Sequence, residues 1–151
     1  MSYKGKFRPK NPKKYNGNPT NIIYRSLLER RFMVYLDNNP SVLKWSSEEI
    51  IIPYVSPLDN KVHRYFPDFY MKYRNNKKMI VEDLIEVKPF NQTSPPNPKR
   101  KLTKTGRKSK RYINEVNNYI INDAKWKQAM KYCDERGWKW RIITEKEINI
   151  Y

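Results

Sequence analysis

The sequence predicts an α/β protein whose mixed β-sheet is flanked by helices, with its elements in the order α-β-β-β-α-α-β. Apolar residues repeat at helical spacing in two separate parts of the chain, one near the start and one in the second half. Between them lie three consecutive segments rich in β-branched and aromatic residues, joined by short links, which indicates an antiparallel meander. A fourth strand-like segment follows the last helical part, and a strand reached through a helical crossover pairs in parallel.

The first expected helix covers residues 24–38, where Leu28 and Phe32 lie on one face. Thr20 or Asn21 is expected to cap its start, because a small polar side chain can accept a hydrogen bond from the free amides of the first turn. An Asn-Asn-Pro sequence ends the helix, since the residue before a proline avoids the helical conformation.

Three strands are expected over residues 45–55, 62–73 and 79–88. The first contains an Ile-Ile-Ile run and the second is rich in aromatic residues, both of which favour strands. Residues 56–60 are expected to form a turn and residues 74–77 a hairpin turn, because Ser, Pro, Asp and Asn concentrate there.

The second half of the chain begins with an expected loop over residues 89–110, in which a proline-rich stretch precedes a run of cations. Helices are expected over residues 109–121 and 122–137, the second starting at a good N-cap residue and ending near a glycine. Residues 138–144 alternate as a final strand, and residues 145–151 are expected to form a short tail.

Length and charge indicate one domain that binds a polyanion. The 151 residues suit a single domain over 21–151, preceded by a basic arm over 1–20 and containing the basic loop 89–110. Twelve Tyr, four Trp and five Phe argue against disorder. The excess of 32 Lys+Arg over 15 Asp+Glu gives a net charge of +17, which favours a nucleic-acid partner, with an anionic membrane surface as the alternative.

Several classes of protein are excluded or not expected. The sequence has no run of about 18 apolar residues, so we expect no segment that spans a membrane. Its first ten residues lack the apolar stretch of a signal peptide, so we do not expect secretion. Cys133 is the one cysteine, which excludes an internal disulfide and fits a reducing compartment, and His63 is the one histidine, which excludes a multi-histidine zinc site.

The candidate catalytic residues are Asp68, in a Pro-Asp pair, and Glu86 and Lys88, which follow it in an apolar strand. Side chains two apart on a strand share a face, so Glu86 and Lys88 point the same way. Folding the hairpin about 75–76 puts Asp68 opposite a residue near 83, and a bulge or slight register shift is needed to bring it to Glu86. Two carboxylates suit Mg²⁺, and a lysine beside them can orient water or balance charge on a phosphate. The pattern predicts a metal-dependent phosphodiesterase.

Simpler interpretations of the same acids remain open at this point. A carboxylate near a strand end is most often a solvated surface group, and Glu-x-Lys is a common pairing of opposite charges. Glu82 and Asp83 are competing acids on the strand of Glu86, and both are interpreted as structural.

Asp68, Glu86 and Lys88 resemble the motif of the PD-(D/E)xK nuclease superfamily. That resemblance implies a restriction-endonuclease-like core, in which a helix is followed by a mixed sheet with flanking helices. The segment Tyr-Arg-Ser-Leu-Leu-Glu, which ends at Glu29, resembles the first helix of the transposon-end nuclease subunits and mismatch nicking enzymes of the superfamily. It implies that Glu29 is a further acid facing the metal site, the alternative being a solvated helix glutamate.

The chain also resembles, in order and over nearly its whole length, the head completion nucleases of contractile-tailed (myovirus-type) phages. The segments that carry this resemblance are the basic opening Gly-Lys-Phe-Arg-Pro-Lys-Asn-Pro-Lys-Lys-Tyr, Arg64-Tyr-Phe-Pro-Asp-Phe-Tyr-Met-Lys, Glu86-Val-Lys-Pro, Lys125-Trp-Lys and Arg136-Gly-Trp-Lys-Trp. One departure is a longer strand before Glu86, with two acids inside it.

This resemblance implies a metal-dependent DNA endonuclease or exonuclease that acts on packaged DNA during virion assembly and is needed for head-tail joining. It implies double-stranded DNA and head, portal-neck or tail proteins as partners, no membrane, and a place in the virion head or neck after assembly in the host cytoplasm. Asp68 and Glu86 are then expected to hold one or two Mg²⁺ or Mn²⁺ ions, with Glu29 binding directly or through water. The metal lowers the pKa of a bound water, and Lys88 orients that water.

Cations near these acids and in the basic loop are expected to contact DNA phosphates, which supply affinity without sequence information. They are Arg25, Arg64, Lys99, Arg100, Lys101, Lys104, Arg107, Lys108, Lys110 and Arg111. Two alternative functions stay open: a non-catalytic DNA-binding neck protein that keeps the nuclease fold, and a transposition or junction nuclease of the same fold.

Overall fold

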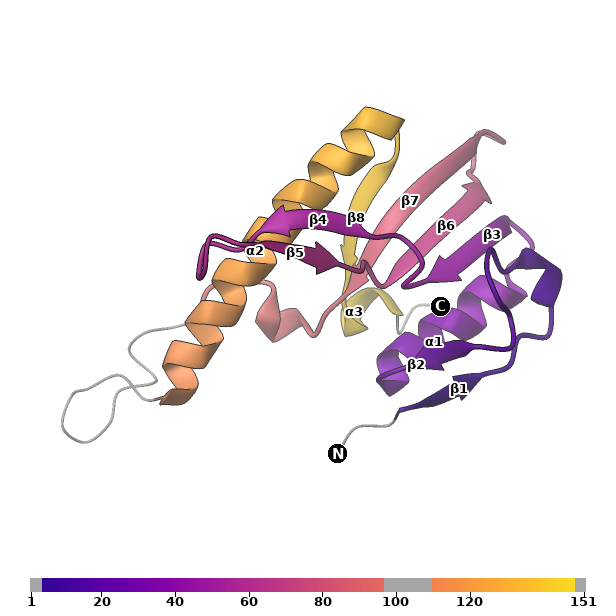
Figure 1. Cartoon of the computed structure of the whole chain (residues 1–151). Coiled ribbons are helices and arrows are strands. Elements are labelled where there is room, and N and C mark those ends of the chain that lie inside the picture. Colours follow the sequence, from indigo (N-terminus) through magenta and orange to yellow (C-terminus); the bar gives the residue numbers. More distant parts are fainter. Residues whose placement is uncertain (1–3, 97–109, 149–151) are drawn as a thin grey trace.

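The fold was analysed in a computed structural model, which describes residues 4–96 and 110–148 (Figure 1). Its elements in chain order are β1 (Gly5–Phe7), η1 (Pro12–Lys14), β2 (Ile22–Tyr24), α1 (Leu27–Asn38), β3 (Val42–Ser47), β4 (Ile52–Val55), β5 (Val62–Tyr65), β6 (Phe69–Arg74), β7 (Ile80–Val87), η2 (Phe90–Gln92), α2 (Lys110–Arg136), β8 (Lys139–Ile143) and α3 (Glu145–Ile148). No helix in the described ranges is both long enough and apolar enough to cross a bilayer.

A four-stranded sheet in the order β3-β6-β7-β8 forms the centre of the protein. The pairs β3–β6 and β6–β7 are antiparallel, and β8 joins β7 in parallel after the chain has passed through α2. The expected mixed sheet with flanking helices is therefore confirmed, including the parallel pairing of its last strand.

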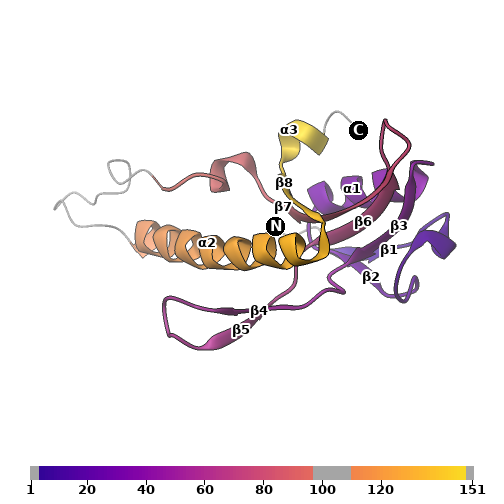
Figure 2. The same ribbon diagram turned by 90° about the horizontal axis from the view of Figure 1, so that it is seen from above.

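The two faces of this sheet pack against different parts of the chain (Figure 2). Alternate residues Phe69, Met71 and Ile85 bury themselves against α1 and the N-terminal segment. Residues of the other parity, such as Tyr70 and Leu84, pack against α2 and the hairpin β4–β5. This alternation follows from the two-residue period of a strand.

The expected strands 45–55 and 62–73 are each divided in two. The first part of the first strand, β3, and the second part of the second strand, β6, pair in the main sheet. The remaining parts, β4 and β5, form a separate hairpin beside α2 (Figure 1). The first strand is divided at Glu48, whose φ of 54° turns the chain out of the sheet. The sequence missed it because a single residue at positive φ is not encoded by hydrophobic alternation, and a glutamate rarely adopts that conformation.

The N-terminal segment is folded, in contrast to the extended arm expected over residues 1–20. β1 pairs with β2, and the side chains of Phe7 and Tyr15 are buried against Trp45 in the core. The buried carboxylate of Asp37 accepts hydrogen bonds from the backbone amides of Lys10, at 2.7 Å, and Asn11, at 3.0 Å. These partners lie 27 and 26 residues away in sequence, so local composition could not reveal them.

Helix α1 begins at Leu27, not at residue 24, and Ser26 caps it by accepting a hydrogen bond from the amide of Glu29. Thr20 and Asn21 are not the cap, because residues 22–24 pair with β1 as strand β2. The predicted end at Asn38 is confirmed.

Helix α2 is continuous over Lys110–Arg136, where the sequence predicts two helices that meet at residue 122. Asn122 and Asp123 lie inside it rather than at a cap, since a helix without internal proline or glycine tolerates such residues at a cost of a few tenths of a kcal/mol. The predicted end is confirmed at Gly137, whose φ of 71° suits a helix C-terminus. The expected tail after residue 144 begins with the short helix α3.

Candidate active site

The β6–β7 hairpin brings Asp68 to the level of Glu86. Phe69 pairs with Ile85, so the next position outward on each strand places these two acids at the same end of the hairpin. The register differs by three residues from the predicted one, because the chain reverses through residues 75–79, with Lys78 at a φ of 61°, and not about 75–76 alone. The Asp68 carboxylate accepts a hydrogen bond of 2.7 Å from the amide of Val87, which ties the two strands together at this point.

Glu86 is held in place by two neighbours. The residue is 7 % exposed, and its Oε2 accepts a hydrogen bond from the hydroxyl of Tyr65 at 2.5 Å. The Nζ of Lys88 lies 4.0 Å from Oε1 of the same carboxylate, as expected for two side chains on one face of the chain. Lys88 itself is anchored beyond the end of β7 by a backbone hydrogen bond from its amide to the carbonyl of Ile143 on β8.

Burial shifts the pKa of both acids upward. It raises the pKa of Asp68 well above its ordinary value, and the nearby charge of Glu86 raises it further. Burial likewise raises the pKa of Glu86, although the Tyr65 hydrogen bond and the charge of Lys88 oppose the shift. Two buried carboxylates that repel each other are the donor set a hard divalent cation prefers, because the cation compensates both charges at once. The residues present therefore fit Mg²⁺ or Mn²⁺.

Glu29 faces the same region from the first turn of α1. Its Oε2 accepts a hydrogen bond of 3.0 Å from the amide of Arg25, and burial raises its pKa while the charge of Lys88 lowers it. Its charge also acts on Asp68 and Glu86. Among residues 4–96 and 110–148, however, no three His, Cys, Asp or Glu side chains lie close enough together to hold a metal ion. The arrangement thus brings Glu29 near the pair.

Glu48 is a further acid at this site that the sequence did not single out. Its backbone amide donates to the carbonyl of Asp68 at 3.1 Å, and its charge raises the pKa of Glu29. Its carboxylate binds both Nε and an Nη of Arg25, at 3.1 and 3.2 Å, so this predicted DNA contact is already engaged in an ion pair. The signal available was a pair of adjacent glutamates inside a segment expected to be a strand.

Lys125, on α2, is a second lysine near the carboxylates. Burial lowers its pKa, whereas the charges of Glu86 and Asp68 raise it. Its Nζ lies 5.5 Å from the ring centroid of Tyr65 and 5.8 Å from that of Tyr54. Its Lys-Trp-Lys segment was noted in the sequence only as part of a resemblance, because nothing local links residue 125 to residues 68 and 86.

The two competing acids of β7 have partners away from the candidate site. Glu82 accepts a hydrogen bond from the hydroxyl of Tyr70 at 2.7 Å. Asp83 is fully buried, and its Oδ2 binds the hydroxyl of Tyr73 and the guanidinium of Arg141, each at 3.0 Å. Both contacts agree with the structural interpretation of these acids.

Some of the predicted DNA-contacting residues are exposed on the described part of the chain, and the others lie outside it. Arg64 is exposed on β5, with its guanidinium 5.7 Å from the ring centroid of Phe66, and Lys110 and Arg111 are exposed at the start of α2. The other members, Lys99, Arg100, Lys101, Lys104, Arg107 and Lys108, lie outside the described residues.

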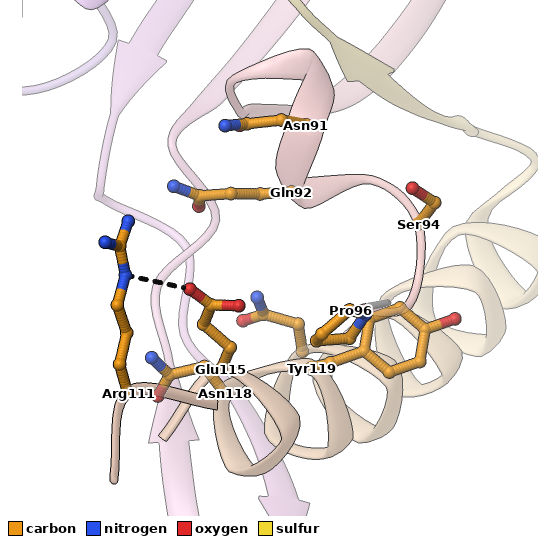
Figure 3. A pocket seen from close by; sticks show the side chains of 9 residues that line it. Asn91, Gln92, Ser94, Pro96, Arg111, Glu115, Asn118 and Tyr119 are labelled. Atoms are coloured by element: carbon orange, nitrogen blue, oxygen red, sulfur yellow. Dashed lines mark hydrogen bonds and ion pairs between the residues drawn. The ribbon is translucent and has the colours of Figure 1, made fainter. Parts of the chain in front are cut away.

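A polar pocket of about 470 Å³ lies between the segment after β7 and the first half of α2 (Figure 3). Carboxamides dominate its lining, and the ion pair between Arg111 and Glu115, at 3.3 Å, closes one side. The lining residues are Asn91, Gln92, Ser94, Pro96, Arg111, Glu115, Asn118, Tyr119 and Asn122. None of the four predicted catalytic residues belongs to this set, so the pocket is distinct from the carboxylate pair.

Comparison with known proteins adds two findings. Residues 39–145 match the family described as "TnsA-like endonuclease N terminal", a span that includes Asp68, Glu86, Lys88 and Lys125. The chain is also 41 % identical over 145 residues to a protein of Enterobacteria phage T4 named "Head completion nuclease". That alignment covers 96 % of this chain and 93 % of the phage T4 protein.

Proposed function

The chain belongs to the TnsA-like endonuclease N-terminal family, within the PD-(D/E)xK type of nuclease, and on that premise we propose that it is a phage head completion nuclease that hydrolyses DNA phosphodiesters with a divalent metal ion. The identity over nearly the full length of both chains supports the assignment to head completion. The observation that carries the catalytic part is the pairing of Asp68, which is partly buried, with Glu86, which is buried, and with Lys88 beside them at the end of β7.

Asp68 and Glu86 are the proposed metal-binding residues, and Mg²⁺ or Mn²⁺ the proposed ion. When bound, such an ion supplies a Lewis acid that activates water and compensates charge on the phosphate. Mg²⁺ commonly takes one or two protein carboxylates and keeps several waters. Glu29, which faces the pair from α1, would contribute a further carboxylate to such an ion, directly or through water.

The remaining residues of the site orient these groups. The amide of Val87 fixes one oxygen of Asp68, and the hydroxyl of Tyr65 fixes one oxygen of Glu86. Each interaction engages one oxygen of its carboxylate, and the other oxygen of Glu86 lies 4.0 Å from the Lys88 ammonium. The ammonium of Lys88, which is partly buried beside Glu86, is placed to orient the attacking water or to stabilise negative charge on the phosphate.

The proposed partners are double-stranded DNA and the phage proteins of the head, the portal-neck region or the tail. The net charge of +17 supports a polyanionic substrate, and the exposed cations of β5 and the start of α2 supply phosphate contacts. In this proposal the protein assembles in the host cytoplasm, acts on packaged DNA and stays in the head or neck of the virion, where it prepares the head for tail joining.

A plasmid-cleavage assay with purified protein tests this function. With Mg²⁺ present, the wild type should convert supercoiled plasmid to nicked or linear DNA, and EDTA should stop the reaction. Asp68→Ala and Glu86→Ala should each be inactive, whereas Glu82→Ala, which changes an acid of the same strand, should cut like the wild type. Equal cutting by all variants would reject the site. A wild type that binds DNA without cutting it would favour the non-catalytic neck protein.

A further inference from the structure

Lys125 lies where a long helix passes over the candidate active site. It projects from the middle of α2 toward the rings of Tyr54 and Tyr65, which come from the two strands of the β4–β5 hairpin. Both tyrosines are buried, at 7 % and 4 % exposure. The aromatic faces therefore confine the lysine side chain to one direction, because a cation over an aromatic ring is attracted to its face.

The charged groups that act on Lys125 are the proposed catalytic residues Glu86, Lys88 and Asp68. Tyr65 contacts both Lys125 and Glu86, since its ring faces the Lys125 ammonium while its hydroxyl donates to the Glu86 carboxylate. Lys125 thus approaches the carboxylate pair from α2, whereas Lys88 approaches it from the sheet.

The ammonium of Lys125 is partly withdrawn from water without a direct counterion. It is only partly exposed, and no carboxylate in the part of the chain that the structure describes lies within ion-pair distance of it. A desolvated cation of this kind costs free energy unless an anion completes its environment. Lys127, two residues later, shows the ordinary alternative: it is exposed and forms an ion pair of 2.9 Å with Asp123.

We propose that Lys125 is a second catalytic lysine, whose ammonium contacts a non-bridging oxygen of the scissile phosphate when DNA lies over Asp68 and Glu86. The inference rests on the proposed nuclease function. A compact ammonium suits this contact because it acts as a point charge that can approach a phosphate oxygen from one side. Its contribution is largest in the transition state, where negative charge on the phosphate oxygens is concentrated in a site shielded from water.

The test compares Lys125→Met, Lys125→Arg and Lys127→Met in the full-length protein, with wild type and Asp68→Asn as references. Single-turnover cleavage of a labelled duplex in Mg²⁺ measures the chemical step. Fluorescence anisotropy in EDTA measures DNA affinity without cleavage, and thermal unfolding measures stability. Lys127→Met is the matched control, because it removes the same charge from the same helix at an exposed position.

The expected result is a fall of about 100-fold or more in the single-turnover rate of Lys125→Met, the loss typical of one transition-state contact. DNA affinity should fall by less than about tenfold, as for one phosphate contact. Lys125→Arg should cut at least about tenfold faster than Lys125→Met because it keeps the charge. Lys127→Met should match the wild type in rate.

Three results would overturn the assignment. The first is a wild-type rate for Lys125→Met while Asp68→Asn is inactive, which leaves the nuclease site intact and removes only the role of Lys125. The second is an equal loss in the Met and Arg variants together with a lower unfolding temperature, which assigns Lys125 to packing alone. The third is cleavage by Asp68→Asn at the wild-type rate, which removes both the proposed site and the role of Lys125 in it.

Discussion

The two faces of the central sheet are built from the same strands and both pack an apolar core, but the acids on the two faces have different partners. The face toward α1 packs an apolar core in which Phe69, Ile85 and Trp45 are almost fully buried, and Asp83, a buried acid of this face, is paired with Arg141. The face toward α2 holds the carboxylates of Asp68 and Glu86, whose pKa values are raised by burial. Both faces contribute buried apolar area, and the face toward α2 in addition holds two carboxylates whose mutual repulsion a bound cation would reduce.

The comparison shows how one strand serves both purposes. Ile85 and Glu86 are adjacent in sequence, but the two-residue period of a strand sends their side chains to opposite faces. Substitutions at neighbouring positions should therefore separate folding from catalysis.

Glu86→Gln should lower the single-turnover rate of DNA cleavage by about 10³-fold or more, because it removes the charge of one of the two proposed metal-binding carboxylates. Stability should be unchanged or higher, since the amide needs no compensation for a buried charge and can still accept the Tyr65 hydrogen bond. Cleavage kinetics and urea unfolding of the same preparation measure the two quantities. A rate within tenfold of the wild type would remove Glu86 from the site.

Ile85→Ala should show the reverse behaviour. Its side chain is fully buried among apolar neighbours, so the cavity should lower the free energy of unfolding by about 2–5 kcal/mol. Cleavage per folded molecule, measured below the unfolding transition, should stay within a few-fold of the wild type. A selective loss of cleavage with unchanged stability would show that the two faces are not separable in this way.

Asp37→Ala tests whether the folded N-terminal segment contributes to the face toward α1. Its loss leaves the amides of Lys10 and Asn11 without their acceptor, which should lower the free energy of unfolding by about 1–3 kcal/mol. Asp134→Ala, at an exposed position near the end of α2, is the control and should change stability by less than about 0.5 kcal/mol. Urea unfolding measures both variants. Equal stability of the two would mean that residues 10 and 11 add nothing to the fold.

Arg111→Ala should have the smallest effect, because the side chain is exposed and far in sequence from the carboxylate pair. DNA affinity should fall modestly, and the slope of log affinity against log salt should decrease by about one unit for one lost phosphate contact. Anisotropy titrations at several salt concentrations measure the slope. Arg136→Ala, at the opposite end of α2, is the control, and an identical slope for the two variants would argue against a specific contact at Arg111.

Much of the fold was predictable because its signals are local. Helical spacing around Phe32, the apolar and β-branched residues of β7, alternation in β8, and the glycine after α2 each act within a few residues of chain. The two helices predicted on either side of residue 122 are one helix, since a favourable cap residue does not by itself interrupt a helix that has no proline or glycine.

Two other differences depend on distant partners. The N-terminal segment folds because its backbone amides donate to Asp37 and its Tyr15 ring packs against Trp45. The composition of residues 1–20 does not reveal these contacts, because both partners lie later in the chain. The hairpin β4–β5 separates from the main sheet because α2, from the other half of the chain, covers it.

Local sequence is enough to identify Asp68, Glu86 and Lys88 as candidates for the chemistry, because acids in apolar segments are rare and the two-residue spacing of Glu86 and Lys88 gives them a common face. That Asp68 lies level with Glu86 follows from the folded chain alone, because a longer turn between β6 and β7 sets the register. The tertiary structure also brought Glu48 and Lys125 to the same place from a strand end and a helix. Electrostatic interaction depends on distance through space, and the separation of residues along the chain does not determine that distance.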